Sequence, residues 1–283
     1  MDMKRIALIL FASVMCLFAF AQSAKDATQI RLVRNATLLI NYNGKKILLD
    51  PMLSPKGAFG SWAGNGVTPS VDLPLPVSEI VDGVDFVLLT HGHVDHFDQP
   101  AIDAIDKETS FFTQPENKQM LLDNNFGNTT AVEDSIINED ITIIRTNAQH
   151  GVGRILDNME AASGFVLKAN NQPTIYVIGD AVWTQEIYDN IKRYKPDYIV
   201  VNSGGAIIPP QEEWRATPII MDEHQTMALL QESGDIPVIA VHMDAVDHCM
   251  TTRDVLRKEA RKFKVSPEKL IIPADGEIVR LNK

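Results

Sequence analysis

Metal-capable side chains are concentrated in one short segment, directly after an apolar, strand-like run at residues 86–89. The segment holds three of the chain's seven histidines and one aspartate, in the order His91-Gly92-His93-Val94-Asp95-His96. Imidazole and carboxylate groups together suit zinc, manganese or iron rather than calcium. An ordinary polar loop rarely reaches this density of metal ligands, so the pattern predicts a metal site where a strand ends.

Length and charge limit the classes of protein to consider. With 283 residues the chain can bury a substantial core, as one large domain or as two fused halves. No break in composition marks a second domain, so we predict a single domain over residues 22–283. The net charge of -11 argues against nucleic-acid binding, because nothing offsets the repulsion of phosphates. A small-molecule partner is therefore expected, and the oligomeric state stays open.

The N-terminus has the pattern of a signal peptide. Lys4 and Arg5 precede an uncharged apolar run over residues 6–20, and Ala19-Phe20-Ala21 fits a small-x-small cleavage site. The run is shorter than the roughly 20 residues of a comfortable membrane span, so no stable span is expected in the mature chain. We predict a signal peptide over residues 1–21 and a bacterial protein exported to the periplasm or secreted. Cleavage would leave Cys249 as the one cysteine, which excludes an intramolecular disulfide.

Strand signals dominate the first third of the remaining chain. Residues 29–34 and 37–42 read as strands, and Asn43-Gly44 predicts a two-residue turn into a third strand at 46–49. Residues 52–76 are rich in glycine, proline and serine, which is typical of a binding loop or lid. After the strand at 85–90, a helix is expected from its cap at Asp98 to about Lys107.

Helices and strands alternate in the rest of the chain. Strands are expected at 164–168, 174–178, 198–201 and 237–241, and helices at 183–194, 222–231 and 251–262, before two short closing strands. Since strands occur in both halves with helices between and after them, the pattern indicates stacked sheets flanked by helices.

Three further strands each end in a potential metal ligand, namely His150, Asp180 and His242. His91 and His93 point the same way if their segment is extended, so they suit one metal ion. Asp95 and His96 are adjacent, so the chain must turn for both to bind a second ion. His248 is a local rival of His242, but His242 directly follows the buried strand and is preferred.

The run from His91 to His96, with His150, Asp180 and His242, resembles the metallo-β-lactamase-fold hydrolase superfamily over nearly all of the mature chain. The hairpin ending Leu48-Leu49-Asp50-Pro51 resembles its lactonase and N-acylphosphatidylethanolamine-hydrolase-like branch, as does the Met-Asp-Glu start of the helix near 222. The chain departs from that branch after Asp180 and after His242, which bears on the substrate.

The resemblance implies an α+β fold, the four-layer αββα sandwich, with a dinuclear centre. One metal ion would be held by His91, His93 and His150, the other by Asp95, His96 and His242, and Asp180 would bridge them. The resemblance implies two divalent ions, most simply Zn²⁺, with Mn²⁺ or Fe²⁺ also acceptable to such ligands.

Two such ions, roughly 3.5–4 Å apart, would share a hydroxide that attacks the substrate. Asp95 is the predicted catalytic residue, because it would orient this nucleophile. We expect a small ester, lactone or phosphodiester as substrate. Trp62 is a candidate for substrate contact, as is His224, which fits a plain surface histidine equally well.

Three alternatives remain open from the sequence. A β-lactamase-like amide hydrolase agrees with export, and a non-catalytic periplasmic protein that binds metal or ligand needs no turnover. The third is an iron-dependent redox member of the superfamily that reduces oxygen, although that branch normally carries an electron-transfer partner, which is not expected here.

Overall fold

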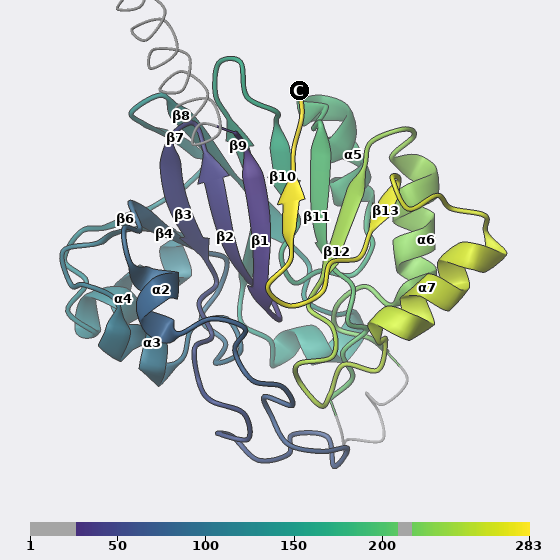
Figure 1. Cartoon of the computed structure of the whole chain (residues 1–283), viewed down its shortest axis with the longest axis horizontal. Helices are drawn as coiled ribbons and strands as arrows, with labels where there is room; N and C mark the ends of the chain where they lie inside the picture. Colours follow the sequence, from purple (N-terminus) through teal and green to yellow (C-terminus); the bar gives the residue numbers. More distant parts are fainter. Residues whose placement is uncertain (1–26, 209–216) are drawn as a thin grey trace, which may run out of the picture.

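Two seven-stranded sheets lie face to face, with helices on the outer face of each (Figure 1). This computed structural model describes residues 27–208 and 217–283, so the predicted signal peptide lies outside the described residues. The order of layers is helix, sheet, sheet, helix, which confirms the predicted αββα sandwich.

The first sheet combines the N-terminal strands with the last strand of the chain. Its order is β14 (Ile278–Arg280), β1 (Gln29–Arg34), β2 (Thr37–Tyr42), β3 (Lys45–Leu49), β4 (Phe86–Leu89), β5 (Ser110–Thr113) and β6 (Thr129–Ala131). Pairing is antiparallel from β14 to β3 and parallel from β3 to β6. The predicted β2–β3 hairpin is confirmed, and its Asn43-Gly44 turn has the two positive φ angles, 50° and 76°, that a type I′ turn requires.

The second sheet is built from the later strands. Its order is β13 (Leu270–Ile271), β12 (Val238–Val241), β11 (Tyr198–Asn202), β10 (Ile175–Val177), β9 (Ala162–Lys168), β8 (Ile141–Ala148) and β7 (Ser135–Asn138). The strands from β10 to β13 are parallel, whereas β7 to β10 pair antiparallel.

Three short helices cover the first sheet and three longer helices cover the second. The first set is α2 (Val77–Val81), α3 (Gln99–Ala104) and α4 (Lys118–Asp123), and the second is α5 (Gln185–Tyr194), α6 (Glu223–Glu232) and α7 (Arg253–Lys262). Each longer helix has a side-chain cap of the favoured type, at Thr184, Asp222 and Thr252. Asp98 caps α3 as predicted, but the helix ends before Lys107, because the backbone at Ile105 is already extended.

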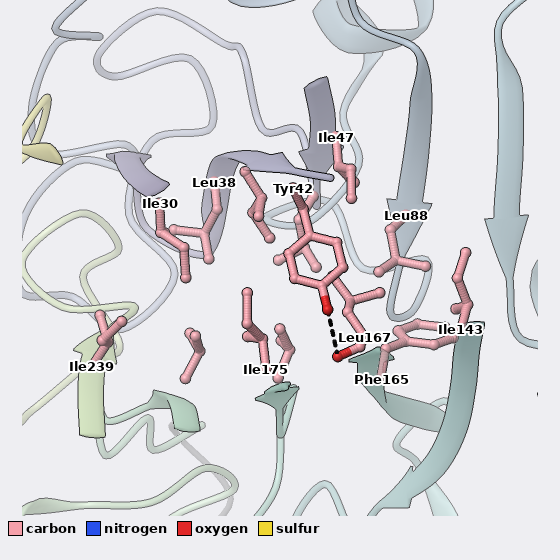
Figure 2. Close-up of a cluster of buried hydrophobic side chains, with 14 of the residues drawn as sticks. Ile30, Leu38, Tyr42, Ile47, Leu88, Ile143, Phe165, Leu167, Ile175 and Ile239 are labelled. Atoms are coloured by element: carbon pink, nitrogen blue, oxygen red, sulfur yellow. Dashed lines mark hydrogen bonds between the residues drawn. The ribbon is translucent and has the colours of Figure 1, made fainter. Parts of the chain in front are cut away.

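The main core lies between the two sheets (Figure 2). Side chains at alternating positions of β2, Leu38 and Tyr42 among them, point into this layer and meet Phe165 and Leu167 of β9. The Tyr42 hydroxyl donates a hydrogen bond to the Leu167 carbonyl across the interface, at 3.3 Å. Burial of each such side chain contributes roughly 1.5–3 kcal/mol, so this layer holds the sheets in a defined relative position.

The long loop predicted at residues 52–76 contains no helix or regular strand, but it is anchored to the sandwich. The guanidinium of Arg34 is buried and donates hydrogen bonds to the carbonyls of Met52, Ser54 and Val71. Because Arg34 is the last residue of β1, its hydrogen bonds to three carbonyls of the loop hold the loop against this strand.

In the described part of the chain, no helix has the length and apolar character needed to cross a lipid bilayer.

Candidate metal centre

The predicted ligands converge at one edge of the sandwich because they follow strands that end there. The segment from His91 to His96 follows β4 of the first sheet. In the second sheet, His150 follows β8, Asp180 follows β10 and His242 follows β12. The ends of neighbouring strands are a common place for ligand sites, because loops there can vary while the sheet stays rigid.

All seven predicted ligands belong to three overlapping groups. Within each group, one possible ligand atom per residue lies within 4.8 Å of the others. The groups are His91 with His93 and His150, His91 with His96 and Asp180, and Asp95 with His96 and His242. We call these seven residues the metal centre.

The spacing of the ring nitrogens fits metal coordination. His93 Nδ1 lies 3.0 Å from His91 Nε2 and 3.3 Å from His150 Nε2. On the other side, His96 Nε2 lies 3.2 Å from His242 Nε2. Two nitrogens bound at about 2.0–2.1 Å in a tetrahedral arrangement are about 3.3 Å apart, so these side chains fit a metal ion of zinc size.

Hydrogen bonds behind the rings decide which nitrogen faces the centre. Asp50 lies 2.8 Å from His96 Nδ1 and accepts a hydrogen bond from the Thr90 hydroxyl at 2.7 Å. Because the hydroxyl hydrogen of Thr90 points at Asp50, the hydroxyl oxygen accepts a hydrogen bond from His91 Nδ1, at 3.1 Å. His150 Nδ1 donates to the Ile219 carbonyl at 2.9 Å. When these Nδ1 atoms carry the ring protons, the Nε2 lone pairs are available to a metal ion.

Sequence reasoning did not assign Asp50 and Thr90 a role at the centre. Asp50 directly follows β3, the strand that pairs with β4, so its position beside the histidine segment was a signal that could have been used.

Asp180 lies between the ligands of the two sides. Its Oδ2 is 3.2 Å from His96 Nε2 and 3.4 Å from His150 Nε2, while Asn202 donates a hydrogen bond to its Oδ1 at 2.5 Å. Asp180 is therefore close to ligands of both predicted sides, and its bridging role stays a prediction.

The backbone before Asp180 requires glycine. Gly179 has φ +76°, and a Cβ there would lie 2.4 Å from the Ser163 carbonyl oxygen. Glycine therefore allows the tight turn that directs Asp180 into the centre.

The electrostatics of the buried residues favour a bound cation. Burial lowers the pKa of His91, and the neighbouring His96 lowers it further. Burial also opposes charge on His96, but Asp180 and Asp50 outweigh it and raise the pKa of His96 to about 10. Burial would raise the pKa of Asp180, yet His96 and His242 hold it well below its usual range. The negative field that favours a proton on these rings also favours a divalent cation, which displaces that proton.

The structure brings His242, rather than His248, to the ligand groups. His242 directly follows β12 with a positive φ of 63°, and its amide donates a hydrogen bond to the Asn35 carbonyl at 2.9 Å. The Asn35 side chain donates to the Asp95 carbonyl at 3.1 Å and lies 3.3 Å from His242 Nε2. His248 belongs to the wall of the adjoining cavity.

A cavity of about 270 Å³ opens over the metal centre. Its lining combines ligands of the centre with apolar side chains, which are Trp62, Val94, Met159, Ile208 and Ile219. Trp62, a predicted substrate contact, is therefore placed in the cavity.

The prediction that His224 contacts the substrate does not agree with the structure. Its side chain is 68% exposed and lies between Glu223 and Glu259, outside the cavity lining. His224 therefore lies beside Glu259 of α7 instead.

Comparisons with known proteins agree with this geometry. Residues 45–243 match the Beta-lactamase superfamily domain. The chain belongs to this superfamily. Its αββα sandwich and its His/Asp clusters able to bind metal are those expected of metal-dependent hydrolases with the metallo-β-lactamase fold.

Three relatives match this member of the superfamily over most of their length. The UPF0173 protein YddR of Bacillus subtilis (strain 168) is 33% identical over 254 residues, which cover 88% of this chain and 98% of that protein. An isothiocyanate hydrolase from Delia radicum gut bacteria is 33% identical with a TM-score of 0.83, and covers 90% of this chain and all of its own. A possible metal-dependent hydrolase from Veillonella parvula is 31% identical with a TM-score of 0.85, at the same coverage.

Proposed function

We propose that this protein is a hydrolase that uses two divalent metal ions on a small, uncharged electrophile with an apolar substituent. The observation that carries the proposal is the position of Asp180, whose carboxylate lies among ligands of both sides beneath an apolar cavity. Structural zinc sites are closed and four-coordinate, whereas this centre opens to a cavity, which supports turnover over a non-catalytic binding role.

Two bound divalent ions would supply a nucleophile at neutral pH and polarise the substrate. The ligands on one side would be His91, His93 and His150, those on the other Asp95, His96 and His242, with Asp180 shared. Zinc is the first expectation, and the same donors accept manganese or iron.

Asp95 is the residue to which we assign the orientation of the attacking water. It is buried at the cavity floor, and its Oδ2 lies 3.3 Å from His242 Nε2. Burial would raise the pKa of Asp95, but His96 and His242 hold it well below its usual range. Asp95 therefore remains a carboxylate at neutral pH, able to accept a hydrogen bond from water and to hold its proton.

The cavity wall favours an uncharged substrate over a phosphodiester. Among the described residues that line it, none is lysine or arginine, the side chains that usually bind phosphate oxygens. Apolar side chains instead suit an alkyl or aryl substituent.

The relative from Delia radicum gut bacteria suggests which electrophile to test first. Water added to the central carbon of an isothiocyanate gives a thiocarbamic acid, which breaks down to an amine and carbonyl sulfide. This reaction attacks an uncharged electrophilic carbon, as ester and lactone hydrolysis do. We therefore rank isothiocyanates first, lactones and esters second, and the phosphodiester and β-lactam substrates last.

A substrate panel tests the proposal. Protein loaded with zinc or manganese is assayed on benzyl isothiocyanate, a γ-lactone, p-nitrophenyl acetate, bis-p-nitrophenyl phosphate and a chromogenic β-lactam. We expect turnover of an uncharged substrate, and a roughly 10²- to 10⁴-fold loss of kcat in Asp95→Asn. Asp103→Asn, an exposed carboxylate on α3, serves as the control. Turnover of the phosphodiester alone would contradict the substrate class, and two bound ions without any turnover would favour the binding protein.

Export is a separate part of the proposal. The apolar run at residues 6–20 and the Ala19-Phe20-Ala21 site support cleavage after Ala21. N-terminal sequencing of the protein from fractionated host cells should give a chain that begins at Gln22. An intact N-terminus in the cytoplasmic fraction would overturn this prediction.

A further inference from the structure

An aromatic wall stands on one side of the cavity. Trp62 from the loop at residues 52–76 and His248 from the segment after β12 line the cavity with ring centroids 5.4 Å apart and planes at 47°. Phe59 stacks on Trp62 at 5.6 Å with an interplanar angle of 28°. Trp62 and His248, with Phe59 packed behind Trp62, therefore give this side of the cavity an aromatic surface next to the metal centre.

Asp247 holds this wall in place. Its carboxylate accepts four hydrogen bonds of 2.5–3.0 Å from one loop, from Ser61 Oγ, Trp62 N, Ala63 N and Thr68 Oγ1. The residue that positions Trp62 is therefore the immediate neighbour of His248. Because several charged hydrogen bonds already fix this wall, little side-chain freedom is lost when a ligand binds, and the wall can select ligands by their shape.

His248 differs from most histidines of the metal centre because its Nδ1 atom has no hydrogen-bond partner. Its Nδ1 is buried, and no group in residues 27–208 or 217–283 lies within hydrogen-bonding distance of it. Four histidines of the centre each have a partner at Nδ1, which is Thr90, Asp50, the Ile219 carbonyl or Cys249. Leaving a buried polar atom without a partner costs free energy, so such an atom in a native structure needs an explanation, for example a role in catalysis or a bound water.

In its neutral form, His248 carries one N–H group, which can donate a hydrogen bond to a ligand in the cavity. Burial lowers the pKa of His248, which favours the neutral ring with one N–H. A buried N–H without an acceptor is rarer than a buried acceptor without a donor, so the proton belongs on Nε2. The Nε2–H group then gives the aromatic wall a donor that can bind a ligand in the cavity.

We propose that His248 is a substrate-binding residue, donating a hydrogen bond from Nε2 to a heteroatom beside the reacting carbon while Trp62 stacks on a planar substituent. The site then selects small, uncharged electrophiles with a flat, unsaturated substituent, such as an aryl group. This inference rests on the proposed function, since it concerns the substrate of the same cavity.

The experiment compares His248→Phe, which keeps a flat ring without a donor, with His248→Gln, whose amide restores one. In His248→Phe, KM for benzyl isothiocyanate should rise about tenfold, the effect of one hydrogen bond, with a smaller change in kcat and unchanged metal content. His248→Gln should recover part of the lost affinity. His224→Phe, a matched change at the exposed histidine outside the cavity, should behave as wild type.

A second measurement does not depend on turnover. Calorimetry on the metal-free full-length protein with N-benzylthiourea, an uncharged and unreactive analogue, should show about tenfold weaker binding in His248→Phe. Wild-type affinity in that variant, or equal losses in His248→Phe and His248→Gln, would overturn the proposal. If the wild-type enzyme hydrolyses no substrate in the panel, the proposed function fails, whereas the thiourea titration still decides for or against the His248 contact.

Discussion

Asp50 links the two sides of the metal centre at the scale of single residues. It contacts His96 directly and reaches His91 through the Thr90 hydroxyl, so one carboxylate orients a ring on each side. Partners of this kind raise the basicity of a ligand and hold its tautomer. Asp50 therefore contributes to both proposed metal ions without binding either.

Replacing Asp50 by asparagine should weaken metal binding about 10- to 100-fold, because the amide is a poorer acceptor for His96 and for Thr90. Titration of the metal-free variant with zinc against a competing chelator measures the effect. Asp103→Asn keeps the same chemical change at an exposed site and should match wild type. Equal zinc affinities in all three proteins would contradict this role of Asp50.

The metal ligands could be predicted from the sequence more easily than the residues that form hydrogen bonds with them. His91, His93, His150, Asp180 and His242 could be found because each follows a strand, and a strand end is visible in a local pattern. Their partners Asn35, Asp50 and Asn202 also stand at strand ends, but which ligand each one contacts depends on which strands become neighbours, and a local pattern does not show that. His224 was misplaced for the same reason, since a sequence does not show which way the first turn of a helix faces.

At the scale of elements, the turn after β10 depends on Gly179. Alanine at this position would have to adopt a positive φ and would meet the Ser163 carbonyl at 2.4 Å. We expect Gly179→Ala to lower the free energy of unfolding by at least about 2 kcal/mol and to weaken metal binding through displacement of Asp180. Urea unfolding and zinc titration test this, with Gly127→Ala as the control, because a Cβ there meets no atom within 4 Å. A wild-type zinc affinity in Gly179→Ala would contradict the expectation.

Asp247 should make the stability of the protein depend on pH, because its carboxylate holds the loop that contains Trp62. Burial would raise the pKa of Asp247, but hydrogen bonds from Ser61 and from the amides of Ala63 and Trp62 lower it to about 2. Because this pKa is below the unfolded value of about 3.9, the carboxylate stabilises the fold fully above that value. The stabilisation is then lost as pH falls towards about 2. The urea midpoints of wild type and Asp247→Asn should differ by a constant amount near neutral pH and converge below about pH 4. A difference that grows with acidity would contradict this account.

Local sequence signals were sufficient to predict most helices and strands. The Asn43-Gly44 turn, the caps at Asp98 and Asp222 and the buried strands after residue 160 each depend on a few neighbouring residues. The end of α3 was predicted too late, because no proline or glycine marks the point at which Ile105 becomes extended.

At the scale of the whole molecule, the sandwich brings together segments that are far apart in the chain. The C-terminal strand β14 pairs with β1, and β13 completes the other sheet, so the last residues contribute to both layers. The strand order could not be derived from periodicity, because these pairings are set by the shared core between the sheets rather than by local sequence. The resemblance carried by the histidine run supplied the αββα arrangement that periodicity alone left as stacked sheets.

We propose that one edge of this sandwich holds two metal ions, with Asp180 shared between them. Elemental analysis of protein purified from its native host compartment, without added metal, measures this directly. We expect about two divalent ions per chain in wild type and a clear loss of bound metal in Asp180→Ala. A wild-type value of one ion per chain or fewer would contradict it.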